Sequence, residues 1–105
     1  MRDDPVVTFP DSFPSSFFYL GTIEIRPAEL RRLFTDDELV AALKRHAGCD
    51  FGQVPWEQHC GNLANIAEHC GWVESLYSSS DKPLLRIGTS MDEFKPRTLI
   101  SAGYG

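Results

Sequence analysis

Between residues 35 and 71 the apolar positions follow a helical period in two successive segments. The first segment opens with Thr35 and Glu38, which have the spacing of a capping box, and it stops at Gly48. Its apolar positions recur every three or four residues: Leu39, Val40, Leu43 and Ala47. Acids follow Thr35 and bases precede Gly48, an order that the helix dipole favours. This pattern predicts a helix from the capping box to residue 47.

The second segment predicts a helix that starts near Pro55 or Trp56 and ends at Gly71. Its apolar stripe consists of Trp56, Cys60, Leu63, Ala64, Ala67 and Cys70. The spacing is typical of a helix packed on a hydrophobic core, and we expect Trp56 and Trp72 to belong to that core. A tryptophan exposed beside acidic residues would instead be an anchor for a binding partner.

The remaining apolar positions alternate with the period of strands. Residues 19–25 predict a first strand, and Pro27 predicts the start of a short helix up to Phe34. Three further strands are expected at residues 72–77, 84–89 and 97–101. Their short connections favour antiparallel pairing. The prediction is an α+β domain over residues 19–101, with two to three helices packed on one face of a three- or four-stranded antiparallel sheet.

Residues 1–18 differ from the rest of the chain because they combine prolines with phenylalanines. The prolines at positions 5, 10 and 14 exclude a helix and disfavour a central strand. We therefore expect an extended arm. Its four phenylalanines favour packing, either on the same domain or on a second copy or another partner.

Charge is unevenly distributed along the chain. The net charge is −5, and residues 35–74 alone hold seven acids and two bases. A basic stripe that could follow a phosphate backbone is absent, which disfavours direct nucleic-acid binding and favours a basic protein partner. The sequence has no apolar run that could span a membrane, and residues 1–5 lack the apolar stretch of a signal peptide. We expect a cytoplasmic protein without membrane contact.

Histidines and cysteines suggest a metal site at first sight: His46, Cys49, His59, Cys60, His69 and Cys70. On one helix, however, Cys60 and Cys70 would be about 15 Å apart, too far to share one zinc ion. Adjacent helical residues also point about 100° apart, so neighbouring cysteine and histidine side chains do not form a nucleophile–base pair. We expect no metal, no cofactor and no catalysis. The odd number of cysteines disfavours a closed set of disulfides.

Several short motifs follow one another along the chain: Arg45-His46, Asp50-Phe51-Gly52, Asn62, Ser75, Tyr77, Leu85 to Thr89, and Thr98 to Ile100. Their order resembles the pattern of a family of small plasmid- and phage-borne accessory proteins, which is of the type His-x-x-Gly-Asp-Trp-Gly. Cys49, Phe51 and Gln58 stand where that pattern has glycine, tryptophan and an acid. The resemblance implies an origin in the mobile elements of bacteria, and it carries over no catalytic residues.

A compact acidic protein from a mobile element resembles anti-CRISPR proteins in general character. The function expected on this basis is non-enzymatic: binding and inhibition of a host protein or ribonucleoprotein complex, most specifically a CRISPR effector. The contact residues expected are Asp36, Asp37, Glu38, Asp50 and Glu57, with Trp56 as an anchor. The alternative is a homodimeric plasmid or phage accessory or regulatory protein without a CRISPR target, which dimerises through its arm.

Overall fold

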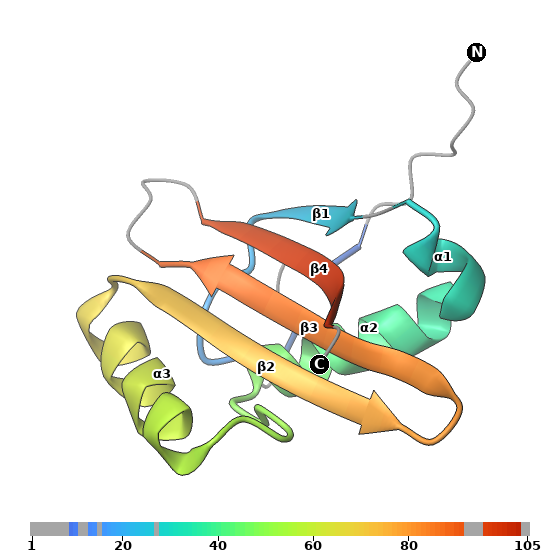
Figure 1. The fold of residues 1–105 in the computed structure, drawn as a ribbon. Helices are drawn as coiled ribbons and strands as arrows, with labels where there is room; N and C mark the ends of the chain where they lie inside the picture. Colours follow the sequence, from blue (N-terminus) through green and yellow to red (C-terminus); the bar gives the residue numbers. More distant parts are fainter. Residues whose placement is uncertain (1–8, 11–12, 15, 27, 92–95, 104–105) are drawn as a thin grey trace.

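The computed structural model describes residues 9–10, 13–14, 16–26, 28–91 and 96–103. In these residues the chain forms an α+β fold, which confirms the predicted class (Figure 1). The elements in chain order are β1 (Thr22–Arg26), α1 (Leu30–Leu33), α2 (Asp36–Ala47), α3 (Trp56–Glu68), β2 (Trp72–Ser79), β3 (Lys82–Ser90) and β4 (Arg97–Gly103). No described helix is long and apolar enough to cross a bilayer.

The four strands form one sheet in the order β1-β4-β3-β2. β2, β3 and β4 are joined as the predicted antiparallel meander. β1 differs because it lies parallel to β4, with Ile23 beside Thr98 and Ile25 beside Ile100. All of the helices and two strands separate β1 from β4 in sequence, so no hairpin forces these two strands to run in opposite directions. The sheet is therefore mixed at this edge.

Helix α2 supplies the side of the core that faces the sheet. Its capping box is present: the Glu38 amide donates to Thr35 Oγ1 over 3.1 Å, and the Thr35 amide donates to Glu38 Oε1 over 2.7 Å. Its inward side buries Leu39, Ala42, Leu43, His46 and Ala47. These residues pack against the inward side chains of the strands: Val73, Tyr77, Leu85, Ile87 and Ile100. Burial of one such leucine contributes roughly 1.5–3 kcal/mol.

A chain of polar groups crosses this core. The His46 ring lies between Ser75 and Thr89, with Nδ1 2.6 Å from Ser75 Oγ and Nε2 3.0 Å from Thr89 Oγ1. Thr89 Oγ1 lies 2.8 Å from Thr98 Oγ1, and Thr98 donates to the carbonyl of Leu20 over 2.7 Å. The four polar side chains are fully or almost fully buried. The chain links α2, three strands and the segment before β1 into one unit.

Helix α3 does not lie on the face of the sheet. Figure 1 shows it running alongside β2, at the edge of the sheet, whereas α2 lies behind the strands. The buried side chain of Asn62 takes the place of a neighbouring strand: its Nδ2 donates to the Glu74 carbonyl over 2.8 Å, and its Oδ1 accepts from the Glu74 amide over 3.1 Å. Asn65 donates in the same way to the carbonyl of Trp72 over 3.1 Å.

The loop before α3 completes this edge. The Leu76 amide donates to the carbonyl of Phe51, and the Gln53 amide donates to the carbonyl of Leu76. Gly52 makes an isolated bridge to Leu76 with φ 70°, and a Cβ there would lie 2.0 Å from the Leu76 carbonyl oxygen. Only glycine fits this approach. The outer backbone groups of β2 are thus paired along most of the strand, which blocks the addition of another strand.

Three phenylalanines from the described part of the predicted arm contact the core of the same chain. Phe18 is buried, and Phe9 and Phe13 are partly buried against the core. Phe17 remains 68% exposed, although its amide donates to the carbonyl of Ala47 over 2.8 Å. Within residues 9–10, 13–14 and 16–18, intramolecular packing therefore predominates. The rest of the arm lies outside the described residues.

Candidate interaction surface

The six residues predicted to contact a partner lie in two separate places. Asp36, Asp37 and Glu38 form the first turn of α2, while Asp50 follows its C-terminal end. A helix of 12 residues is about 18 Å long, so α2 holds these two acidic positions well apart. Trp56 and Glu57 begin α3. The expected carboxylates therefore do not form one continuous patch.

Most of these carboxylates already have a basic partner in the same molecule. Asp36 pairs with Arg31 at 3.2 Å, Glu38 with Lys82 at 2.8 Å, and Asp50 with Arg45 at 2.8 Å. The hydrogen bond from Lys82 lowers the pKa of Glu38, and the hydrogen bond from Arg45 lowers the pKa of Asp50. No described lysine or arginine lies within ion-pair distance of Asp37 or Glu57.

The apolar stripe of α3 faces solvent, which corrects the prediction that it packs on the core. The exposed members are Trp56, Cys60, Leu63, Ala64 and Ala67. Trp56 is 74% exposed and Leu63 is 44% exposed. The physical reason is the place of the helix at the sheet edge. The backbone of β2 there requires hydrogen-bonding groups, so the amide-bearing side of α3 turns inward and the apolar side turns outward.

Neither tryptophan lies in the core, which corrects a second prediction. The Trp56 ring stacks on His59 with centroids 5.2 Å apart and an interplanar angle of 14°. His59 in turn packs edge-on against the buried ring of Phe51, 5.3 Å away. Trp56 is therefore supported on one face, while most of its surface remains available to a partner. Trp72 is 42% exposed on β2 and leans over Gly88.

The surroundings of the stripe are acidic. Glu57 and Glu68 are exposed on α3, and the sequence has no lysine or arginine between His46 and Asp81. The acidic balance of this region is evident from the sequence, but the predicted contact residues do not include Leu63 or Glu68. The long stretch without a base, which coincides with an amphipathic helix, is the signal that would have identified them. We define the α3 face as Trp56, Glu57, Cys60, Leu63, Ala64, Ala67 and Glu68.

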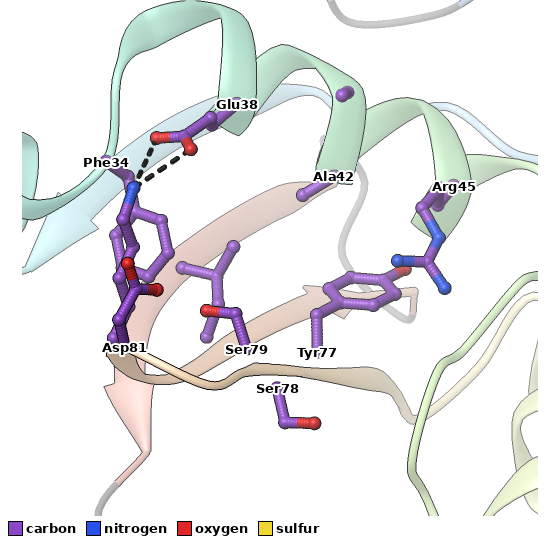
Figure 2. Close-up of a pocket in the computed structure, with 11 residues that line it drawn as sticks. Phe34, Glu38, Ala42, Arg45, Tyr77, Ser78, Ser79 and Asp81 are labelled. Atoms are coloured by element: carbon purple, nitrogen blue, oxygen red, sulfur yellow. Dashed lines mark hydrogen bonds and ion pairs between the residues drawn. The ribbon is translucent and has the colours of Figure 1, made fainter.

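A groove between α2 and the β2–β3 hairpin is the second candidate (Figure 2). Its volume is about 370 Å³, within the range of small-molecule sites. Phe34 and Glu38 lie at one end, and Arg45 and Tyr77 lie at the other. The Arg45 guanidinium lies 4.4 Å from the centroid of the Tyr77 ring and also binds Asp50. Glu38 at one end is paired with Lys82, and Arg45 at the other end is paired with Asp50, so these two charged groups are less available to orient a ligand.

The residues that carry the family resemblance have structural partners. Arg45 binds Asp50 and covers Tyr77, whose hydroxyl donates to the Asp50 carbonyl over 2.6 Å. Asn62 pairs with the edge of β2, and His46 with Ser75. Although Ser75 and His46 are close enough to resemble a nucleophile and its base, both are 0% exposed, so no substrate reaches them in this fold.

The cysteines are free thiols in three different settings. Cys60 is exposed on the α3 face, whereas Cys49 and Cys70 are partly buried. Burial raises the pKa of the Cys49 thiol, which disfavours the reactive thiolate. Among the described residues, no three histidine, cysteine, aspartate or glutamate side chains gather closely enough to hold a metal ion.

We found no protein-family model, curated protein or solved structure that matches this chain.

Proposed function

We propose that this chain is a non-enzymatic protein of a bacterial mobile element that binds a larger host protein or ribonucleoprotein complex and inhibits it. The specific target proposed is a CRISPR effector, so that the protein acts as an anti-CRISPR in the host cytoplasm. Binding involves contacts with basic protein surface and not with nucleic acid. The α3 face makes the main contact, and Asp37 is a secondary acidic position.

The observation that supports this proposal is the outward apolar side of α3. A chain of 105 residues needs most of its large apolar side chains for the core, yet Trp56 and Leu63 are exposed to solvent on one helix face. Exposed apolar groups that cluster within an acidic region are typical of a protein interaction site. Tryptophan is also among the residues that contribute most to binding energy in interfaces.

The test is direct binding of the full-length chain to purified CRISPR effector complexes of several types, together with their nuclease activity. We expect one effector to bind and to lose activity, and Trp56→Ala to weaken binding at least tenfold. If none of the effectors binds, the CRISPR target is wrong. If an effector binds the wild-type chain and Trp56→Ala equally well, the α3 face is not the contact.

The acidic turn of α2 is tested best with a single substitution. Reversal of Asp36, Asp37 and Glu38 together would remove the capping box and two ion pairs, and therefore would disturb the fold. Asp37→Lys alone leaves these contacts in place. A loss of effector binding in this variant with unchanged circular dichroism would assign the α2 turn to the interface.

The alternative function is a homodimeric accessory or regulatory protein without a CRISPR target. It is favoured by Phe17 and Tyr19, two residues apart on the segment before β1, which are 68% and 52% exposed. Phe18 belongs to the core, so deletion of residues 1–18 would damage the fold. Light scattering on wild type and on Phe17→Ser is the better comparison. A dimer that Phe17→Ser converts to monomer would favour this alternative.

A further inference from the structure

We propose that the α3 face receives a basic amphipathic helix of the partner, which packs lengthwise along α3. This inference rests on the proposed binding function and names the kind of partner surface that the function uses. Its basis is the spacing of the exposed apolar residues, the charges beside them and the rigid support beneath them.

The spacing of the apolar positions matches a helix–helix seam. Trp56, Cys60, Leu63 and Ala67 follow one another at intervals of four, three and four residues, all on the exposed side of α3. This interval pattern is that of the a and d positions in paired helices, whose side chains insert between those of a partner helix. The small side chains of Cys60 and Ala67 leave room for the knobs of the partner. Trp56 and Leu63 supply the knobs of this chain.

The charges beside the seam favour a partner helix of the opposite charge. Glu57 and Glu68 are 11 residues apart, or about three turns, so they lie on the same side of the stripe about 16 Å from each other. α3 carries no lysine or arginine. Charges that flank a helix seam determine the choice of partner, and two carboxylates in this position favour a helix with lysine or arginine along its matching flank.

The same charges disfavour a second copy of this chain as the occupant. In an antiparallel pair, Trp56 would face Ala67 of the other copy, which brings Glu57 close to Glu68 of that copy. In a parallel pair, two Trp56 rings would face each other and two Ala67 methyls would leave a gap. The antiparallel pair therefore places like charges together, and the parallel pair has side chains whose volumes do not match. A basic partner helix avoids both problems.

The support beneath the seam keeps it in place. The buried Asn62 holds α3 to β2 through two hydrogen bonds, and Asn65 adds a third. If the helix rotated to hide its apolar side, the backbone amide and carbonyl of Glu74 would lose their hydrogen-bond partners. The apolar side therefore remains exposed until a partner covers it, and the surface is preorganised for binding.

The experiment uses a synthetic peptide of 21 residues with leucine at a and d positions and lysine at the flanking e and g positions. A matched peptide carries glutamate in place of lysine. Binding to the ¹⁵N-labelled full-length chain is followed by NMR. We expect the lysine peptide to bind, with the largest shifts on α3 and on the Trp56 indole. The glutamate peptide should bind at least tenfold more weakly.

Two leucines of equal exposure provide the control. Leu63 and Leu33 are both 44% exposed, the first in the seam and the second in α1. Leu63→Glu should weaken binding of the lysine peptide at least tenfold, while Leu33→Glu should leave the affinity for this peptide unchanged. Glu57→Lys combined with Glu68→Lys should reverse the preference between the two peptides. Equal effects of the two leucine variants, or shifts confined to α2 and the groove, would overturn the inference.

The outcomes separate this inference from the proposed function. If an effector complex binds and Leu63→Glu has no effect on it, the helix seam is wrong but the function stands. If the lysine peptide binds the seam and no effector complex does, the seam stands and the CRISPR target is wrong. If the free chain instead forms a dimer that Leu63→Glu dissociates, the seam is a self-association surface and the basic partner helix is wrong.

Discussion

The ring of His46 shows how single hydrogen bonds determine a protonation state. Thr98 donates its only hydroxyl proton to the carbonyl of Leu20, so it accepts a proton from Thr89. Thr89 must then accept from Nε2–H of His46, which leaves Nδ1 to accept from Ser75. This order requires the neutral imidazole with its proton on Nε2. A second ring proton would face the Ser75 hydroxyl in a site without a carboxylate partner among the described residues.

Stability should therefore depend on pH through His46. Burial lowers the pKa of His46 from 6.5 to about 3. The unfolded chain binds this proton below about pH 6.5 and the folded chain does not, so the free energy of unfolding falls as pH decreases. We expect a slope approaching about 1.4 kcal/mol per pH unit between pH 6 and 4.5, measured by urea denaturation at each pH.

The control for this prediction is His46→Gln, which retains hydrogen-bonding groups but does not titrate. It should be less stable at pH 7 and nearly independent of pH down to about 4.5. The carboxylates with lowered pKa values, Glu38 and Asp50, favour the fold above their unfolded pKa, so their contribution is lost only at lower pH. An unchanged slope in His46→Gln would exclude His46 as the source.

Cys49 adopts a backbone conformation that suits glycine. Its φ is 67°, in the left-handed region where an L side chain costs about 1–2 kcal/mol. Cys49→Gly should therefore stabilise the protein by about 0.5–1 kcal/mol, because relief of strain exceeds the loss of a partly buried thiol. Thermal unfolding would measure the effect. A decrease in melting temperature would mean that the thiol's packing outweighs the strain.

At the level of elements, the sequence predicts where helices begin better than which side they bury. The capping box locates the start of α2, and α3 begins at Trp56, one of the two predicted starts, but it ends at Glu68 and not at the predicted Gly71. The buried side of α3 was predicted wrongly because amphipathicity indicates only that two sides differ. A helix on a sheet face buries its apolar side, whereas a helix at a sheet edge must offer hydrogen bonds. The parallel pairing of β1 is likewise determined by a non-local contact.

The burial of His46 could be predicted from the sequence, but its hydrogen-bond partners could not. Leu39, Leu43 and His46 recur at intervals of four and three residues, so the histidine shares the side of α2 that carries the buried leucines. That spacing favours a buried histidine over a metal ligand. Its partners Ser75 and Thr89 come from strands 29 and 43 residues away, and local patterns do not predict such pairings.

The docking of α3 gives a prediction at this scale. Asn62→Ala should destabilise the protein by about 2–4 kcal/mol, because it leaves the amide and the carbonyl of Glu74 without partners in a partly buried place. Asn65→Ala removes a single, more exposed hydrogen bond and should cost about 1 kcal/mol or less. Urea denaturation of both variants would test the difference. If both variants lost the same free energy of unfolding, the two hydrogen bonds to Glu74 would contribute no more than the single one to Trp72.

At the scale of the whole molecule, the polar links make α2 and the sheet one cooperative unit while the two sheet edges differ. β3 lies between two antiparallel partners, and β1 is a strand of five residues at the edge. In native-state hydrogen exchange we expect Ile87 to be among the slowest amides and Ile23 and Ile25 to exchange much faster. Comparable protection of Ile23 and Ile87 would show that another segment covers the outer side of β1.

The inner side of α3 docks the helix on β2, whereas its outer side is the proposed contact surface. A substitution on its inner side would let the helix lift away and leave β2, a strand of eight residues, with bare amides and carbonyls. Such molecules would join edge to edge and precipitate. Samples of such a variant would be turbid, and any loss of binding would then result from low solubility. A substitution on the outer side would leave the docking on β2 intact and yield clear, monodisperse samples in which only the proposed binding is lost.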